Sequence, residues 1–145
     1  MPCATLSLGS NLGQRHENLR QAIFSLQERV GSVVACSAFI TTQPWGFESE
    51  HEFLNAVVRV NTGLTPRQLL LETQKIERDT GRLLKSRDGV YHDRVIDIDI
   101  LTYDDMVMDE HFVCEDRELT LQLPHPHMRE RDFVMIPLRQ IDFDI

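Results

Sequence analysis

The sequence predicts an α+β fold in which an antiparallel sheet carries two helices on one face. Segments of alternating apolar and polar residues, typical of half-buried strands, are interleaved with segments whose apolar residues recur every three or four positions, typical of amphipathic helices. Residues that favour turns separate the segments. The chain has 145 residues, the size of one domain, so we expect residues 1–145 to form a single domain.

The first strand and helix come early in the chain. Leu6 and Leu8 alternate with polar residues over residues 5–10, which predicts a strand, and a glycine-containing turn follows it. Over residues 17–30 the apolar residues recur at helical spacing: Leu19, Ile23, Leu26 and Val30. Gly31 then ends the predicted helix.

Two further strands are predicted at residues 33–42 and 53–61. In the first, one face carries Val34, Cys36, Ala38 and Ile40. In the second, one face carries Leu54, Ala56, Val58 and Val60. The loop between them, residues 42–52, is long for a hairpin, and long loops are often functional.

The second helix begins at Thr65, an N-cap residue, with Pro66 in the first helical position. Its buried stripe consists of Leu69, Leu70, Thr73, Ile76 and Thr80, and Gly81 ends it. A polar loop leads to a last long strand at residues 95–103. The resulting order, β-α-β-β-α-β, predicts a ferredoxin-like core with a four-stranded sheet. Shorter C-terminal elements follow: a small hairpin near 106–113, a strand at 119–123 and a helical turn from 133.

Composition excludes several classes of protein. No apolar run approaches the roughly 20 residues that a membrane helix needs. The formal net charge of −8 argues against a nonspecific nucleic-acid binder, which would have a basic face. Cys3, Cys36 and Cys114 are an odd number without short-range pairing, so we expect free thiols and a reducing cytoplasm.

Asp97 and Asp99 lie two residues apart in the last predicted strand, so they share a face, whereas Ile96, Ile98 and Ile100 face the core. Aspartate is depleted in strands, and two adjacent carboxylates repel each other unless a cation lies between them. Carboxylates combined with substrate phosphates are the usual ligands of Mg²⁺. An isolated pair of this kind is most often surface decoration, but its surroundings here favour a metal and phosphate site.

Those surroundings are basic. Six of the fifteen basic residues lie between positions 75 and 94: Lys75, Arg78, Arg82, Lys85, Arg87 and Arg94. A charged run alone usually indicates a solvated helix end and loop. Arginines beside a metal-binding pair are what a polyphosphate substrate requires.

Two other groups have functional and structural interpretations. His125 and Arg131 flank a proline-containing turn and could contact phosphate, although a rigid surface turn is an equally good interpretation; zinc is disfavoured because no further ligands have suitable spacing. Phe53 and Asn55 share a strand face and could stack on a flat heterocycle and bind its edge. On the residues alone, a core phenylalanine and a loop-supporting asparagine are the simpler interpretation.

Taken together, the motifs resemble the 6-hydroxymethyl-7,8-dihydropterin pyrophosphokinase family of folate biosynthesis, over nearly the whole chain. They are LGSNLG at 8–13, TQPWG at 42–46, FLNA at 53–56, QKIE at 74–77, GR at 81–82, RVIDIDIL at 94–101, LPHP at 123–126 and RDF at 131–133. The chain departs from many relatives at three places: Leu84 and Thr120 stand where an arginine is common, and His92-Asp93 stand where Gly-Pro is common.

The resemblance implies a role for each matching residue. The ligands of two Mg²⁺ ions would be Asp97 and Asp99. The catalytic arginines would be Arg82 and Arg94. The ATP-binding residues would be Gln74, Glu77, Arg94, His125 and Arg131. The pterin-binding residues would be Thr42, Pro44, Trp45, Phe53, Asn55 and Phe133.

The implied reaction transfers pyrophosphate from ATP to the hydroxyl of 6-hydroxymethyl-7,8-dihydropterin, giving AMP and the pterin diphosphate. The implied partners are these two small molecules, without nucleic acid or membrane, and we expect a cytoplasmic monomer. Two alternatives stay open at this point. One is a non-catalytic ferredoxin-like module that binds a metabolite; the other is a Mg²⁺-dependent phosphotransferase acting on another heterocycle.

Overall fold

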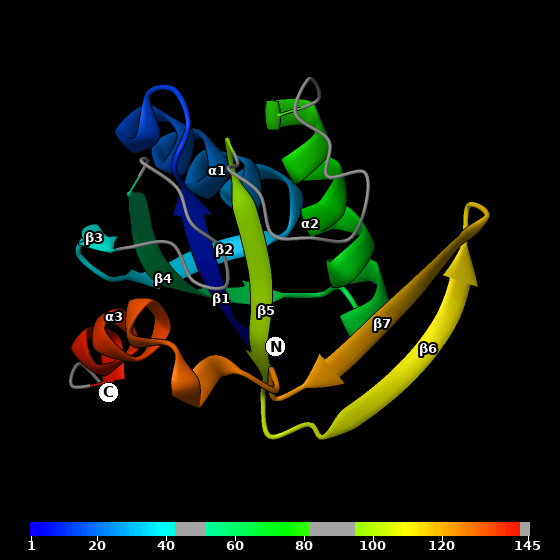
Figure 1. Ribbon diagram of the computed structural model, residues 1–145. Coiled ribbons are helices and arrows are strands. Elements are labelled where there is room, and N and C mark those ends of the chain that lie inside the picture. Colours follow the sequence, from blue (N-terminus) through cyan, green and yellow to red (C-terminus); the bar gives the residue numbers. More distant parts are fainter. Residues whose placement is uncertain (43–51, 82–94, 143–145) are drawn as a thin grey trace.

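The computed structural model describes residues 1–42, 52–81 and 95–142, and it has an antiparallel sheet between two layers of helices (Figure 1). The helices are α1 (Arg15–Arg29), α2 (Pro66–Gly81), the short 3-10 helix η1 (Met128–Glu130) and α3 (Asp132–Asp142). The strands are β1 (Cys3–Ser10), β2 (Gly31–Cys36), β3 (Ile40–Thr42), β4 (Phe53–Thr62), β5 (Asp97–Tyr103), β6 (Met108–Cys114) and β7 (Arg117–Leu123).

The main sheet has the strand order β2-β4-β1-β5, and β3 pairs with the other half of β4. All of these pairings are antiparallel. Helices α1 and α2 cover one face, which confirms the predicted ferredoxin-like α+β core (Figure 1). Helix α3 covers part of the opposite face and is longer than the single predicted turn.

Strand β4 lies in the interior of the sheet and is buried on both faces. Ala56, Val58 and Val60 pack towards α1 and α2, whereas Val57 packs against Val134 of α3. In the described part of the chain, no helix is long and apolar enough to cross a membrane.

The prediction of one continuous strand over residues 33–42 is wrong, because the chain is interrupted between β2 and β3. The pairing register with β4 shifts between Val33 and Ala35, and these two side chains pack into different clusters on opposite faces of the sheet. Ser37 then donates its N–H to the carbonyl of Val57, and its hydroxyl accepts the N–H of Val57, each at 2.9 Å. This irregularity allows β3 to pair with the opposite end of β4.

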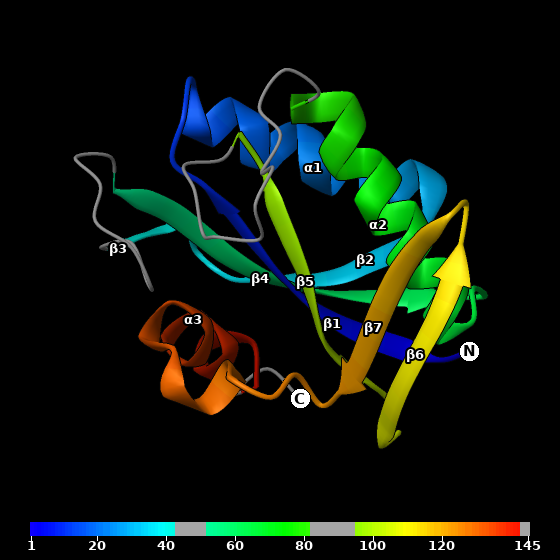
Figure 2. The ribbon, with the colours of Figure 1, turned by 45° about the vertical axis from the view of Figure 1, so that its right-hand side comes forward.

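The prediction of a small hairpin within residues 106–113 is wrong, because residues 108–114 form a single strand that pairs with the predicted strand at 119–123. Strands β6 and β7 form a two-stranded hairpin that extends from the end of β5 alongside α2 (Figure 2). Three leucines of β7 are buried, namely Leu119, Leu121 and Leu123. Arg67 of α2 forms an ion pair with Glu110 of β6 at 2.7 Å, which links the hairpin to the helix.

Gly31 joins α1 to β2 and is required by the packing of backbone against backbone. A Cβ atom at this position would lie 1.9 Å from the carbonyl oxygen of Asn61 in β4. The helix itself already ends at Val30, whose backbone is right-handed helical. Gly31 therefore permits a close approach of two strands.

We expect Gly31→Ala to destabilise the protein by about 1–3 kcal/mol or more, because the added methyl group forces β2 away from β4. Gly63→Ala is the matched control, since a Cβ there meets nothing within 4 Å. Urea unfolding of both variants measures the difference. Equal stabilities for the two variants would contradict this account of the β2–β4 contact.

Candidate active site

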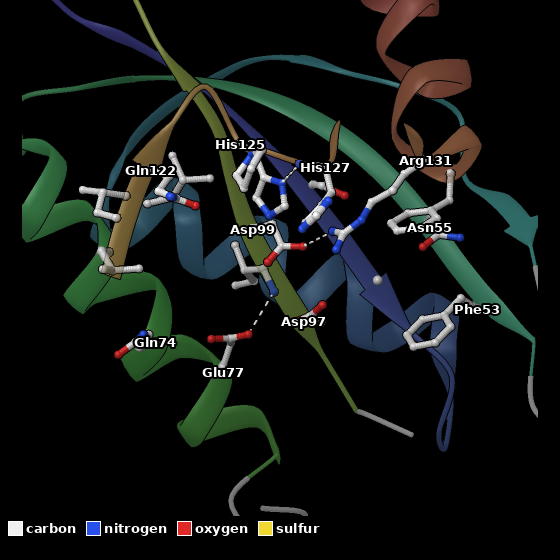
Figure 3. Close-up of a pocket in the computed structure, with 18 of the residues that line it drawn as sticks. Phe53, Asn55, Gln74, Glu77, Asp97, Asp99, Gln122, His125, His127 and Arg131 are labelled. Carbon is white, nitrogen blue, oxygen red and sulfur yellow. Dashed lines mark hydrogen bonds and ion pairs between the residues drawn. The ribbon is translucent and has the colours of Figure 1, made fainter. Parts of the chain in front are cut away.

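A cavity of about 510 Å³ lies between α2, β5, β7 and the segment that leads into α3 (Figure 3). Its size is within the range of small-molecule sites. The floor includes residues of β1 and β4, so the cavity draws on strands from the middle of the sheet as well as from its edge. Three groups of side chains line the cavity. Carboxylates lie in the middle, aromatic and amide side chains lie at one end, and a mixture of polar and apolar side chains lies at the other end.

The central carboxylates are Asp97 and Asp99 of β5. The predicted alternation is confirmed, because Ile96, Ile98 and Ile100 are buried in the core while the two aspartates line the cavity. Burial of the isoleucines prevents the strand from rotating, and rotation is the only simple way to turn both carboxylates away from the cavity.

Glu77 of α2 brings a third carboxylate to the same region. One of its oxygens accepts the backbone N–H of Ile98 at 3.0 Å, which ties the helix to β5. Burial, and after it the negative charge of Asp97, raise the pKa of Glu77 well above its ordinary value, although the Ile98 hydrogen bond opposes this shift. The carboxylates are therefore close enough to repel one another.

This crowding of negative charge fits a divalent cation. Carboxylate oxygens are hard ligands of the type that Mg²⁺ prefers, and Mg²⁺ commonly takes one or two protein carboxylates and completes its shell with phosphate oxygens and water. Within residues 1–42, 52–81 and 95–142, no three candidate ligands converge on one point. Asp97 and Asp99 thus suit a metal that a substrate helps to hold.

Positive charge reaches the carboxylates from Arg131, at the junction of η1 and α3. Arg131 is only 5% exposed, and its Nη1 donates to Asp99 Oδ2 at 3.4 Å. Its guanidinium carbon lies 5.5 Å from the ring centre of Phe133. The pocket therefore contains an arginine that is held among a carboxylate and an aromatic ring.

His125 lies beside this arginine and is uncharged at neutral pH. Desolvation, followed by the positive charge of Arg131, lowers the pKa of His125 from 6.5 to about 4. Its Nδ1 accepts the backbone N–H of His127 at 3.2 Å, so the ring proton of the neutral form belongs on Nε2. His125 can thus offer one N–H donor to a ligand without adding a charge.

Phe53 and Asn55 of β4 lie at one end of the cavity (Figure 3), and Thr42 and Phe133 also line the cavity. Asn55 is 2% exposed, and its Nδ2 donates to the hydroxyl of Thr42 at 2.6 Å. Gly9 of β1 leaves room beside this group, since a Cβ there would lie 3.1 Å from Asn55 Oδ1. An aromatic ring and an oriented amide can hold the face and the edge of a flat heterocycle.

The other end is formed by α2, β5 and β7, with Gln74 and Gln122 on the side away from Phe53 (Figure 3). Gln74 Oε1 is buried, and nothing in the described part of the chain forms a hydrogen bond with it. A buried acceptor without a partner is costly, so a donor from a bound ligand would stabilise it. Leu70, one turn before Gln74 in α2, adds apolar surface to the cavity.

The structure brings together every predicted site residue that it describes. All of the following line the cavity: Thr42, Phe53, Asn55, Gln74, Glu77, Asp97, Asp99, His125, Arg131 and Phe133. Four predicted residues lie outside the described residues: Pro44, Trp45, Arg82 and Arg94.

Several residues that line the cavity are not predicted from the sequence. They are Ser7, Gly9, Leu70, Thr120, Leu121, Gln122, Pro126 and His127. A glycine inside a predicted strand is a sign of close approach, and it was the available signal for Gly9. Thr120 and Gln122 reach the cavity only because of where the β6–β7 hairpin lies, and no local sequence pattern predicts that position.

Comparisons with known proteins point to one family. The family model of 7,8-dihydro-6-hydroxymethylpterin-pyrophosphokinase (HPPK) matches residues 5–143. A 2-amino-4-hydroxy-6-hydroxymethyldihydropteridine pyrophosphokinase of Porphyromonas gingivalis is 50% identical over 141 residues, which are 97% of this chain and 91% of the relative. The protein of the same name from Bacillus subtilis is 39% identical over 139 residues, covering 95% of this chain and 77% of the relative.

Solved structures show the same fold. A crystal structure of HPPK-DHPS in complex with substrates matches 97% of this chain with a TM-score of 0.71 and 15% identity. Wild-type HPPK-DHPS of Plasmodium falciparum with SDX-DHP matches 96% of it with a TM-score of 0.73 and 16% identity. This chain spans about 40% of the length of each. Together with the family model and the curated relatives, these matches confirm the resemblance seen in the motifs: the chain belongs to the 7,8-dihydro-6-hydroxymethylpterin-pyrophosphokinase family.

Proposed function

We propose that this protein transfers pyrophosphate from ATP to the hydroxyl of 6-hydroxymethyl-7,8-dihydropterin, giving AMP and the pterin diphosphate in folate biosynthesis. One observation carries the proposal: Asp97 and Asp99 lie between two ends of a single cavity, with Phe53 and Asn55 at one end and Gln74 and Gln122 at the other, and we assign one ring to each end. Two heterocyclic substrates bound at the two ends would meet over the carboxylates.

The pterin belongs at the Phe53 and Asn55 end. Its ring would stack between Phe53 and Phe133, and its polar edge would face Asn55, which Thr42 already orients. A pterin edge presents both donors and acceptors, and an asparagine amide offers both as well. Pro44 and Trp45 are proposed to complete this end on the strength of the family motif.

ATP belongs at the end formed by α2 and β7. Gln74 and Glu77 would face the nucleoside side, and the triphosphate would extend over β5 towards His125 and Arg131. Arginine binds phosphate in a bidentate manner, and a neutral histidine can donate one hydrogen bond. Arg82 and Arg94 are proposed as further phosphate ligands and as the catalytic arginines, from their positions in the family motif.

Asp97 and Asp99 would hold Mg²⁺, and we expect two ions, as in the family. Bound Mg²⁺ supplies Lewis-acid polarisation of the phosphates and neutralises their charge. The residues of this chain orient the two substrates and keep the phosphates beside the pterin hydroxyl. That hydroxyl oxygen loses its proton, which passes to solvent, and forms a bond to the β-phosphorus. The bond from the β-phosphorus to the oxygen bridging it to the α-phosphorus breaks, and AMP leaves with that oxygen.

We propose that the chain forms one domain and acts in the cytoplasm as a monomer. A single domain is enough to form the proposed active site, because one cavity is lined by residues of β1, β4, β5, β7 and α2. All three cysteines, Cys3, Cys36 and Cys114, are free, which suits a reducing cytoplasm. We expect the protein to act as a monomer on its two small-molecule substrates, without nucleic acid.

Asp97→Asn and Asp99→Asn should each lower kcat by about 10²–10³-fold while the protein stays folded, because each removes a proposed metal ligand and relieves charge repulsion in the free protein. The control is Asp105→Asn, an exposed residue in the turn after β5. AMP release under saturating Mg²⁺ measures kcat, and thermal unfolding checks the fold. Activity at the level of the control in either variant would refute that residue's metal assignment.

Asn55→Ala should raise KM for the pterin about tenfold or more and leave KM for ATP within about twofold, since a site built to bind polar edges loses affinity when one partner is removed. Gln74→Ala should do the reverse. Steady-state kinetics with each substrate varied in turn tests both variants, which serve as controls for each other. A proportional rise of both KM values in both variants would argue against separate ends for the two substrates.

A further inference from the structure

In the free protein, Arg131 forms an ion pair with Asp99, one of the proposed metal ligands. Its Nη1 lies 3.4 Å from Asp99 Oδ2, and the two side chains are 5% and 29% exposed. The arginine is not a surface group that swings freely, because it is buried and its guanidinium carbon also lies 5.5 Å from the ring centre of Phe133. The contact with Asp99 is therefore a built feature of the pocket.

A divalent cation at Asp99 would compete with this arginine. The metal ion and the guanidinium would both bind the Asp99 carboxylate. Two cations a few ångströms apart in a partly desolvated pocket repel each other strongly. Arginine remains charged at all ordinary pH values, so the competition cannot be relieved by loss of a proton.

A metal ion alone has little to offset this competition. Within the described residues no group of three candidate ligands is placed to hold a metal ion, so without a nucleotide these residues offer Mg²⁺ an incomplete set of ligands. A triphosphate changes the balance in two ways. It adds oxygen ligands for the metal, and it offers Arg131 a multiply charged partner with bidentate geometry, which binds a guanidinium more strongly than the 3.4 Å contact with one Asp99 oxygen.

We propose that Arg131 is a placeholder cation: it pairs with Asp99 while the pocket is empty, weakens the binding of a divalent ion on its own, and moves to the phosphates when metal and nucleotide bind together. This inference rests on the proposed function, because it takes Asp99 to be a metal ligand and the nucleotide to be the source of phosphate. By linkage, nucleotide should then strengthen metal binding as much as metal strengthens nucleotide binding.

The test uses Mn²⁺ as a spectroscopic probe with the full chain. The electron paramagnetic resonance signal of free Mn²⁺ gives its affinity for the wild type, for Arg131→Met and for Arg129→Met, with and without α,β-methylene-ATP. Arg129 is the matched control, because it is an exposed neighbour in η1 and its replacement changes the net charge equally.

Without nucleotide, Arg131→Met should bind Mn²⁺ about tenfold or more tightly than the wild type, and Arg129→Met should stay within about twofold of it. The gain in Mn²⁺ affinity on adding the analogue should be smaller in Arg131→Met than in the wild type. Equal affinities for the two variants in the absence of nucleotide would overturn the placeholder role.

A second measurement needs no variant and guards against misfolding of Arg131→Met. In the ¹⁵N NMR spectrum of the wild type, the Nε resonance of Arg131 should stay in place when millimolar Mg²⁺ is added alone and should shift when Mg²⁺ and α,β-methylene-ATP are added together. A full shift with Mg²⁺ alone would contradict the proposal. If the wild type bound no Mn²⁺ even with the analogue, the proposed metal site itself would fall, which separates that failure from failure of the placeholder role.

Discussion

The placement of charge in this protein depends on the anchoring of β5. Ile98 and Ile100 are held in the core, so the period-two alternation of the strand presents Asp97 and Asp99 to the cavity. The repulsion between the carboxylates is thereby opposed by apolar burial, at about 1.5–3 kcal/mol for each isoleucine. Glu77 reinforces the arrangement by accepting the Ile98 N–H, although burial and the negative charge of Asp97 raise its own pKa.

The rest of the pocket is arranged around that strand. The sheet order places β1 beside β5 and β4 beyond β1, so Gly9 and Asn55 lie on one side of the aspartates. Helix α2 and the β6–β7 hairpin supply the other side (Figure 2). The segment before α3 contributes Arg131, whose positive charge offsets part of the negative charge of the aspartates. The proposed site for two rings and a polyphosphate is built from these neighbours of β5.

Local patterns in the sequence predict most of the core and much of the site. The alternation at 96–100 and the helical stripe at 69–76 involve residues close in the chain, so they identify both the isoleucines and the pocket-facing positions of β5. The break between β2 and β3 depends on Ser37 bonding to Val57 across the sheet, which no local pattern predicts. The positions of Thr120 and Gln122 depend on the packing of a hairpin against α2, which is likewise a tertiary matter.

The most direct test of the central claim is the identity of the products. The purified protein would be incubated with ATP, Mg²⁺ and 6-hydroxymethyl-7,8-dihydropterin, with and without EDTA, and the nucleotides and pterins separated by chromatography. The account predicts AMP and a pterin diphosphate in equal amounts, formed only when the pterin and Mg²⁺ are both present. ADP with a pterin monophosphate, or AMP formed at the same rate without the pterin, would contradict it.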